Sequence, residues 1–578
     1  MTEPILSDPS DAAADRRALR WVVLATLALS GYMLAWSIGT LPVLGDEAQH
    51  IRRVQVYFQT GFPRHRITHD PAYPPKGFSS IRYYDTCLWH MALATLWRVL
   101  GEPSFVAAQV YHVIYFFAFA VFSYLTGRRF YGRVGGLWAW ALAVTTPMNL
   151  LFGMLFYLEI PALAFAMATV YFLVRERPIL MGVALAGLVL TKATTATVLA
   201  PPLVAAALLT MGPTFRRRLL RTGLMAAVCV AVMLPDMLWR YEHFGVLFML
   251  RDWTRGIGFS LTYDIGPPKQ TAIPFDILDP VVDLQMFGIT GILATVAGIL
   301  VAVGLVGRGL RAVWCEVRSR GLRAALASLP ALLNDKRLIL VLPLFFYDAA
   351  FVVMLRRAYD VRYFQPTILF TGVLTAGLLA RWRPLAWARR GRWPVRAAAW
   401  LLLLTMAGQD LAVPPYVHFR RAVPSEVLTA FDWIRRHTPE KARFLYLEAN
   451  LVTLTGRPLI WAAAMPRYLF TVPEREQVRV LYNLGVEYIA IHPTRRCDSV
   501  SRDFEPTAYP RPWVASLASR PYLIRVYPEG NLEDTEGRFL IYRVDASKMP
   551  KEWTQGGHPE VSNPFWSGTS PDEPPAAP

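Results

Sequence analysis

The sequence has only four cysteines, and they lie far apart, at Cys87, Cys229, Cys315 and Cys497. Their spacing fits neither a cysteine-based metal site nor a disulfide framework. A cleavable signal peptide is also lacking, because the first apolar block follows three arginines and is long enough to act as a signal anchor. No internal repeat is found either, which counts against the paired-repeat plan of many transporters.

Acidic residues are the minority charge: 42 Asp and Glu stand against 60 Lys and Arg, for a net charge of +18. A basic balance can indicate a nucleic-acid partner, but here the positive residues form short clusters between apolar blocks. That distribution is typical of membrane proteins, whose cytoplasmic loops are positive. We therefore expect contact with membrane lipids and no nucleic-acid partner.

What is abundant is apolar sequence, with 54% hydrophobic residues and a mean hydropathy of +0.31. The excess lies in blocks close to the length of about 20 residues that crosses a bilayer. The eleven blocks cover 21–41, 105–127, 134–153, 156–174, 179–194, 196–212, 219–238, 286–306, 337–355, 364–381 and 396–412. The pattern predicts a polytopic α-helical membrane protein with about eleven spans.

The positive clusters predict the orientation of these spans. They place the N-terminus in the cytoplasm and the C-terminus outside, provided that the short apolar segment 86–101 does not cross. That segment contains His90, Arg98 and several tryptophans, so we expect an interfacial helix. Too few residues separate Arg177 from Arg216 for more than two short crossings, which puts Lys192 at the outer end of a helical hairpin.

The composition changes after residue 412 and predicts a small soluble α/β domain. An amphipathic helix is expected at 425–437 with Ser425 as its N-cap, and another helix at 474–484. Strands are expected at 443–448, 486–492, 524–526 and 539–544. The predicted divisions are a cytoplasmic segment 1–20, a membrane module 21–412 with an outer loop 42–104, an outer domain 413–547, and a disordered tail 548–578.

The strongest local motif follows the first span directly, in the run from Gly45 to His50. Asp46, Glu47 and His50 fall near one face of a helix, with His50 one turn after Asp46. Adjacent carboxylates at a membrane boundary are costly unless solvated or paired, so they indicate a candidate general base. The alternative is a solvated helix start, where acidic residues are also favoured.

Further polar residues are expected on the same outer face. His69 and Asp70 lie in a proline-rich part of the outer loop, which is either a binding loop with an optional metal or a loop shaped by its prolines. Glu159 and Lys192 each interrupt an apolar run, so they are substrate-binding candidates or partners in a structural salt bridge.

Arg357 and Arg362 lie on the outer side in this topology, against the positive-inside pattern. Guanidinium groups bind phosphate through two parallel hydrogen bonds, so an anionic phosphate ligand would explain them. A lipid headgroup or pairing with Asp360 are the alternatives.

Together these motifs resemble the membrane glycosyltransferases of the GT-C class. Asp46-Glu47, His50-Ile51, Gln55, Gly61 and Pro74-Pro75 are similar to the opening of the dolichyl-phosphate-glucose α-1,2-glucosyltransferases. Residues 156–196 are similar to their third luminal acid and the hairpin after it, and the run around Asp360, Arg362 and Tyr363 to a late motif of the class. The sequence departs from that group at Lys76 and Glu159, and its outer C-terminal domain resembles the bacterial enzymes instead.

The resemblance implies transfer of a sugar from a polyprenyl- or dolichyl-phosphate donor to a glycan or lipid-linked acceptor. It implies Asp46 as the base, oriented by Glu47 or His50, and Arg357, Arg362 and Lys192 as candidate cations for the leaving phosphate. Inversion at the anomeric carbon is expected; no cofactor is required and a divalent cation is optional. The bacterial style of the C-terminal domain suggests a bacterial inner membrane with a periplasmic active site.

Two other function classes fit part of the sequence. A transporter or flippase of a lipid-linked substrate would also have many spans and buried charges, although it would usually carry them near the midplane. A non-catalytic envelope assembly protein would bind through the outer domain. A polar cavity at the outer face favours the enzyme, whereas a central pathway favours transport.

Overall fold

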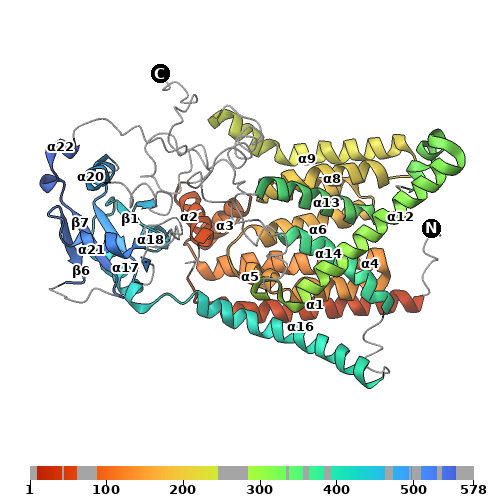
Figure 1. Cartoon of the computed structure of the whole chain (residues 1–578), viewed down its shortest axis with the longest axis horizontal. Helices are drawn as coiled ribbons and strands as arrows, with labels where there is room; N and C mark the ends of the chain where they lie inside the picture. The colour runs from red at the N-terminus through yellow and green to blue at the C-terminus, as the bar shows by residue number, and fades with distance from the viewer. Residues whose placement is uncertain are drawn as a thin grey trace.

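The computed structural model is mostly helical, with one α/β domain at its C-terminal end (Figure 1). It describes residues 9–41, 45–60, 88–244, 284–332, 337–355, 364–382, 392–448, 450–461, 473–483, 485–493, 496–497, 509–529 and 537–554. Long helices lie side by side in a bundle. The short helices α2 and α3 lie between one end of this bundle and the C-terminal domain, while α1 begins at the opposite end.

All eleven predicted apolar blocks are helical. The helices of the bundle are α1 (Pro9–Ser37), α4 (Phe105–Thr145), α5 (Pro147–Met154), α6 (Glu159–Val174), α7 (Pro178–Thr191), α8 (Ala193–Thr210), α9 (Phe215–Phe244), α12 (Leu284–Leu332), α13 (Leu338–Leu355), α14 (Gln365–Trp382) and α16 (Trp393–Arg420). Within the described ranges six helices are long and apolar enough to cross a membrane, or seven if the bent pair of α5 and α6 is one span. The count of eleven crossings stays a prediction.

Several predicted boundaries differ from the structure. The first helix begins at Pro9 rather than 21, and the last runs to Arg420, past the predicted module end at 412. The block 134–153 is divided between α4 and α5 at Thr146, where the backbone is extended and Pro147 begins the new helix.

The helix α4 joins two of the predicted blocks through a bend at Gly132, which has a φ of 74°. Glycine takes this left-handed conformation without steric cost. The two halves then pack closely, because Gly127 and Gly136 leave no side chain between them. At this bend Arg128 forms an ion pair with Asp15 of α1. Similarly, Arg221 of α9 pairs with Glu176, between α6 and α7, at 2.5 Å.

The bundle has a buried apolar core and an apolar exterior. Core side chains such as Phe116, Met167 and Phe370 are fully buried. Large apolar side chains also cover the outside, including Leu300 and Leu401, whose exposed fractions are 67% and 68%. Contiguous exposed apolar surface on long helices is expected where lipid is the solvent. The chain is thus an integral membrane protein.

The predicted interfacial segment forms helix α3 (Leu88–Leu100), which packs against α2 (Gly45–Thr60) at the end of the bundle (Figure 1). Arg98 of α3 donates hydrogen bonds to the carbonyls of Tyr57 and Phe58, at 2.8 and 3.0 Å. These carbonyls belong to the last turn of α2, where backbone acceptors lack helical partners and attract positive charge. Arg98 therefore caps α2 from the neighbouring helix.

The C-terminal domain contains the predicted strands and helices and several more. Its five-stranded sheet has the order β2-β1-β3-β7-β6; the first three strands are parallel, and β7 runs antiparallel to β3 and β6. The elements are α17 (Ser425–His437), β1 (Phe444–Tyr446), α18 (Asn450–Thr455), β2 (Leu459–Trp461), α20 (Glu474–Asn483), β3 (Tyr488–Ile491), β4 (Arg496–Cys497), β5 (Tyr509–Pro510), α21 (Arg511–Leu517), β6 (Leu523–Tyr527), β7 (Leu540–Val544), a 3₁₀ helix (Ala546–Lys548) and α22 (Lys551–Thr554).

Helices cover both faces of this sheet. Phe444 and Tyr446 of β1 pack with α17 on one face, while Leu445 packs with α20 and α21 on the other. This alternation is the period-two pattern of a strand buried on both sides.

Two predictions for the domain are wrong. Ser425 is the first residue of α17 and the N-cap is Pro424, which has no side-chain hydroxyl to donate or accept. The predicted disorder from 548 onward fails over 548–554, because Met549 and Trp553 pack into the domain core and hold this segment in place. The remainder of the predicted tail lies outside the described residues.

Candidate active site

The predicted base motif lies in the first turn of α2. Asp46 is its second residue, and the Asp46 side chain lies outside the described part of the structure. The neighbouring Glu47 is fully buried, and its Oε1 accepts a hydrogen bond from the backbone N–H of Phe156 at 3.1 Å. Glu47 is thus paired inside the protein, and the alternative of a solvated helix start does not hold for this residue.

The charged partner of Glu47 is Arg421, directly after α16. Its buried guanidinium also donates to Thr40 Oγ1 at 3.0 Å and to the carbonyl of Met154 at 2.8 Å. Burial lowers the pKa of Arg421 to about 9, which still leaves the group protonated at neutral pH. The ion pair therefore joins the ends of α1, α5 and α16 to the start of α2.

Sequence reasoning missed Arg421. The available signal was the pair Arg420-Arg421 at the outer end of the last span, which breaks the positive-inside pattern just as Arg357 and Arg362 do. Nothing in the sequence indicated its partner, because Arg421 and Glu47 lie 374 positions apart in the chain.

A second charged pair confirms one of the alternatives left open by the sequence. Lys192 Nζ donates to Glu159 Oε1 at 2.5 Å, with exposed fractions of 15% and 6% for the two side chains. Glu159 is the first residue of α6, and Lys192 joins α7 to α8 as the predicted hairpin requires.

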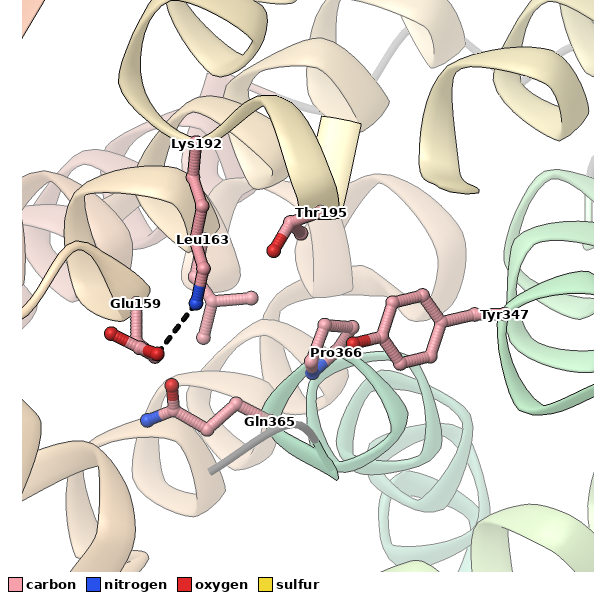
Figure 2. Close-up of a pocket in the computed structure, with 7 residues that line it drawn as sticks. All are labelled: Glu159, Leu163, Lys192, Thr195, Tyr347, Gln365 and Pro366. Atoms are coloured by element: carbon pink, nitrogen blue, oxygen red, sulfur yellow. Dashed lines mark hydrogen bonds and ion pairs between the residues drawn. The ribbon is translucent and has the colours of Figure 1, made fainter. Parts of the chain in front are cut away.

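This pair lines a small pocket together with Thr195, Tyr347 and Gln365, shown in Figure 2. The lysine side chain reaches across toward Glu159, while the Thr195 hydroxyl and the Gln365 amide lie on other sides of the same space. The pocket holds about 220 Å³ of space that is partly open. Much of this space is open solvent or too narrow for a water molecule, so the side chains leave room for about one water between them.

The two charged clusters lie at the same end of the bundle. Glu47 binds the backbone of Phe156, and Glu159 begins the next helix three residues later in the chain. Between them the chain bends by 115° from α5 into α6. The connection between α5 and α6 therefore brings the motif after the first span close to the Glu159–Lys192 pocket.

His50 has a partner that the sequence did not suggest, on the neighbouring helix α3. Its Nδ1 lies 3.0 Å from Nε2 of His90 on α3, and both rings are buried. One nitrogen must donate and the other accept, so the two rings cannot both be protonated in this geometry. Tyr157 and Trp89 pack edge-on against His50. The hydrogen bond joins α2 to α3; whether His50 also orients Asp46 stays a prediction.

The remaining predicted residues lie outside the described ranges. They are His69, Asp70, Arg357, Arg362 and Tyr363. Tyr363 directly precedes Phe364 and Gln365 in the chain, and Gln365 is on the pocket wall. Among the described residues no group of three or more His, Cys, Asp or Glu side chains is arranged to hold a metal ion.

Comparison with known proteins shows which fold the chain has. No family model matches the chain, and no curated protein matches it in sequence. Solved structures do match: the chain has the fold of the GT-C membrane glycosyltransferases, as its motifs predicted.

Three of the structures that it resembles come from bacteria and archaea. ArnT from Cupriavidus metallidurans, solved with undecaprenyl phosphate, is 16% identical, with a TM-score of 0.54 over 92% of this chain and 99% of that one. The archaeal oligosaccharyltransferase AglB from Archaeoglobus fulgidus, solved with an inhibitory peptide and a dolichol-phosphate, is 11% identical, with a TM-score of 0.51 over 92% and 75%. The arabinofuranosyltransferase AftD from Mycobacteria is 16% identical, with a TM-score of 0.50 over 94% and 42%.

Proposed function

We propose that this protein transfers a sugar from a polyprenyl- or dolichyl-phosphate donor to a lipid-linked or envelope acceptor at the outer membrane face. The observation that carries the proposal is the match of membrane bundle and C-terminal domain together to ArnT, over 99% of that chain. ArnT was solved with undecaprenyl phosphate and AglB with a dolichol-phosphate, so two proteins of this fold bind a lipid phosphate. The resemblance of the motifs in this sequence points to the same donor class.

The arrangement of charge supports the same reading. Glu47, Glu159, Lys192 and Arg421 are all at the end of the bundle that carries the C-terminal domain. Charged side chains are costly near lipid, and a group of them at one edge indicates a functional site. A transporter would instead be expected to carry them near the midplane.

In the proposed reaction the acceptor hydroxyl attacks the anomeric carbon of the donor. Asp46 accepts the hydroxyl proton as the new C–O bond forms, and the bond from the anomeric carbon to the phosphate oxygen breaks. The lipid phosphate leaves as an anion, stabilised by Arg357 and Arg362. Direct attack opposite the leaving group inverts the anomeric carbon.

The ion pair with Glu159 refines the expected role of Lys192. Because a carboxylate already offsets its charge, Lys192 contributes less net charge to a phosphate than the two arginines. We assign the Glu159–Lys192 pair to the wall of the sugar or phosphate pocket. Tyr363, which follows Arg362 in the chain, is proposed to bind substrate as well. His69 and Asp70 are proposed to bind substrate from the outer loop.

The test uses the full chain in vesicles with a radiolabelled polyprenyl-phosphate sugar. Wild type should transfer label to acceptor and release free polyprenyl phosphate, whereas Asp46→Asn should lose at least about a hundredfold in turnover while it still binds donor. Asp432→Asn, on an exposed face of α17, is the matched control.

Two outcomes would contradict the proposal. Label that crosses the bilayer without release of polyprenyl phosphate would support a flippase, and full turnover by Asp46→Asn would remove this residue as the base. Activity after removal of divalent cations with EDTA decides whether a metal takes part.

A further inference from the structure

The start of α2 is held from two sides by parts of the chain that lie far away in sequence. On one side is Arg421, which follows the last membrane helix. On the other is α18 of the C-terminal domain, which packs directly on α2. Figure 1 shows α18 between the domain sheet and α2.

Two hydrogen bonds connect α2 to the domain, and each is accepted by a backbone carbonyl, one on α2 and one on α18. Thr453 Oγ1 of α18 donates to the carbonyl of Ala48 at 2.9 Å, and Gln55 Nε2 of α2 donates to the carbonyl of Thr453 at 3.1 Å. Thr453 is buried, with 5% of its surface exposed. Ala48 is two residues after Asp46, so this bond fixes the backbone of the turn that carries the proposed base.

The contact with Arg421 fixes the same turn from the membrane side. Glu47 Oε1 is bound by Arg421 and by the backbone N–H of Phe156. Its Oε2 is buried and has no hydrogen-bond partner among the described residues. Both groups that bind Oε1 belong to segments outside α2, so Glu47 ties the start of this helix to the membrane bundle.

From these contacts we infer that Arg421 and Thr453 are positioning residues that clamp the first turn of α2 and so set the place of Asp46. Glu47 is then the side chain through which Arg421 holds α2, rather than a second base. The inference rests on the proposed function for its catalytic consequence, but the clamp itself is a structural claim. It gives the C-terminal domain a role in the membrane site.

The physical reason is the sensitivity of proton transfer to distance. The carboxylate of a general base must lie within hydrogen-bond reach of the acceptor hydroxyl, and a misplacement of about 1 Å can cost about a hundredfold in rate. A helix end is free to fray unless groups outside the helix hold it. Here Arg421, directly after α16, holds the Glu47 side chain, and Thr453 of α18 holds the Ala48 carbonyl.

The first experiment compares two threonines of the same helix. Thr453→Val removes the hydroxyl that binds Ala48, whereas the control Thr455→Val removes a hydroxyl that bonds to Leu451 and Arg457 within the domain. In hydrogen–deuterium exchange on the full chain, Thr453→Val should raise exchange in the first two turns of α2 at least about threefold. Thr455→Val should leave α2 unchanged. Equal exchange in α2 for both variants would overturn the clamp.

The second experiment separates positioning from catalysis at the ion pair. Arg421→Lys keeps the charge but loses the planar fork, and Glu47→Gln keeps an oxygen for Phe156 but loses the charge. Each should lower kcat about tenfold with donor KM within about threefold of wild type. The double variant should be no worse than the worse single variant. Arg457→Lys, a buried arginine that bonds within the domain, is the control.

The outcomes are distinguishable from failure of the proposed function. If wild type transfers no sugar, the exchange experiment still tests the clamp. If Glu47→Gln is as inactive as Asp46→Asn while α2 exchanges as in wild type, Glu47 takes part in the chemistry and the positioning role is overturned. A slower turnover of Arg421→Lys with no change in α2 exchange overturns it as well.

Discussion

At the scale of single residues, the protein places opposite charges in pairs where lipid and buried surface would make lone charges costly. Lys192 with Glu159, and Arg421 with Glu47, each join segments that are distant in the chain. Taking two charges out of water is expensive, so such pairs add less net stability than their attraction suggests. Removing one partner is different, because it leaves the other charge buried.

This asymmetry predicts the behaviour of the pocket pair. Glu159→Gln and Lys192→Met should each destabilise the protein by about 3 kcal/mol, whereas the double variant should recover part of that loss. Thermal unfolding of the three variants in detergent measures these losses of stability. If the double variant loses the sum of the two single losses, the residues are not energetically coupled.

At the scale of elements, glycines decide how closely helices approach. A Cβ at Gly127 would overlap the Ala139 side chain and come within 2.8 Å of the Gly135 carbonyl, so this position forms the contact between the two halves of α4. In contrast, nothing lies within 4 Å of a Cβ built at Gly304 of α12.

The comparison predicts that replacing glycine by alanine has opposite effects on stability at the two positions. Gly127→Ala should destabilise the protein by about 1–3 kcal/mol through overpacking, whereas Gly304→Ala should stabilise it by up to about 1 kcal/mol through helix propensity. Thermal unfolding of both variants under the same detergent conditions provides the measurement. A Gly127→Ala variant as stable as wild type would show that the two halves of α4 can move apart without loss of stability.

Also at this scale, Arg98 caps α2 from α3. Arg98→Ala should raise hydrogen exchange at the last turn of α2 about threefold or more, because two carbonyls lose their charged donor. Arg129→Ala, an exposed arginine beside the α4 bend, should leave that turn unaffected. Unchanged exchange in Arg98→Ala would mean that packing alone holds the end of α2.

At the scale of the whole molecule, the positive clusters and the C-terminal domain lie at opposite ends of the bundle. The pairs Arg128–Asp15 and Arg221–Glu176 mark the end at which α1 begins, and Figure 1 places the domain at the other. The positive-inside rule then predicts a domain on the non-cytoplasmic side.

Two cysteine positions test that orientation. Cys315 is exposed on α12 and should react with a membrane-impermeant maleimide only from the cytoplasmic side. A cysteine introduced by Lys441→Cys in the domain should react only from the outside, in a background without the four native cysteines. Reaction of both positions from one side would refute the topology.

Local patterns were enough for the architecture of the chain. Apolar runs, turn residues and strand alternation are short-range signals, so they located the eleven apolar helices, the hairpin at Lys192 and the principal strands of the domain. They were less reliable for the ends of elements, because α16 continues to Arg420 and the domain is folded through Thr554. Packing, which a local pattern does not contain, decides where those elements stop.

The sequence by itself determined that this protein crosses a membrane, that its acidic motif follows the first span, and that a soluble α/β domain comes last. Only the tertiary structure decided that Glu47 faces Arg421, that His50 faces His90, and that Thr453 binds the helix of Asp46. The physical reason is that hydrogen bonds and ion pairs depend on distance in space. Residues that are up to 405 positions apart leave no periodic trace of their contact in the chain.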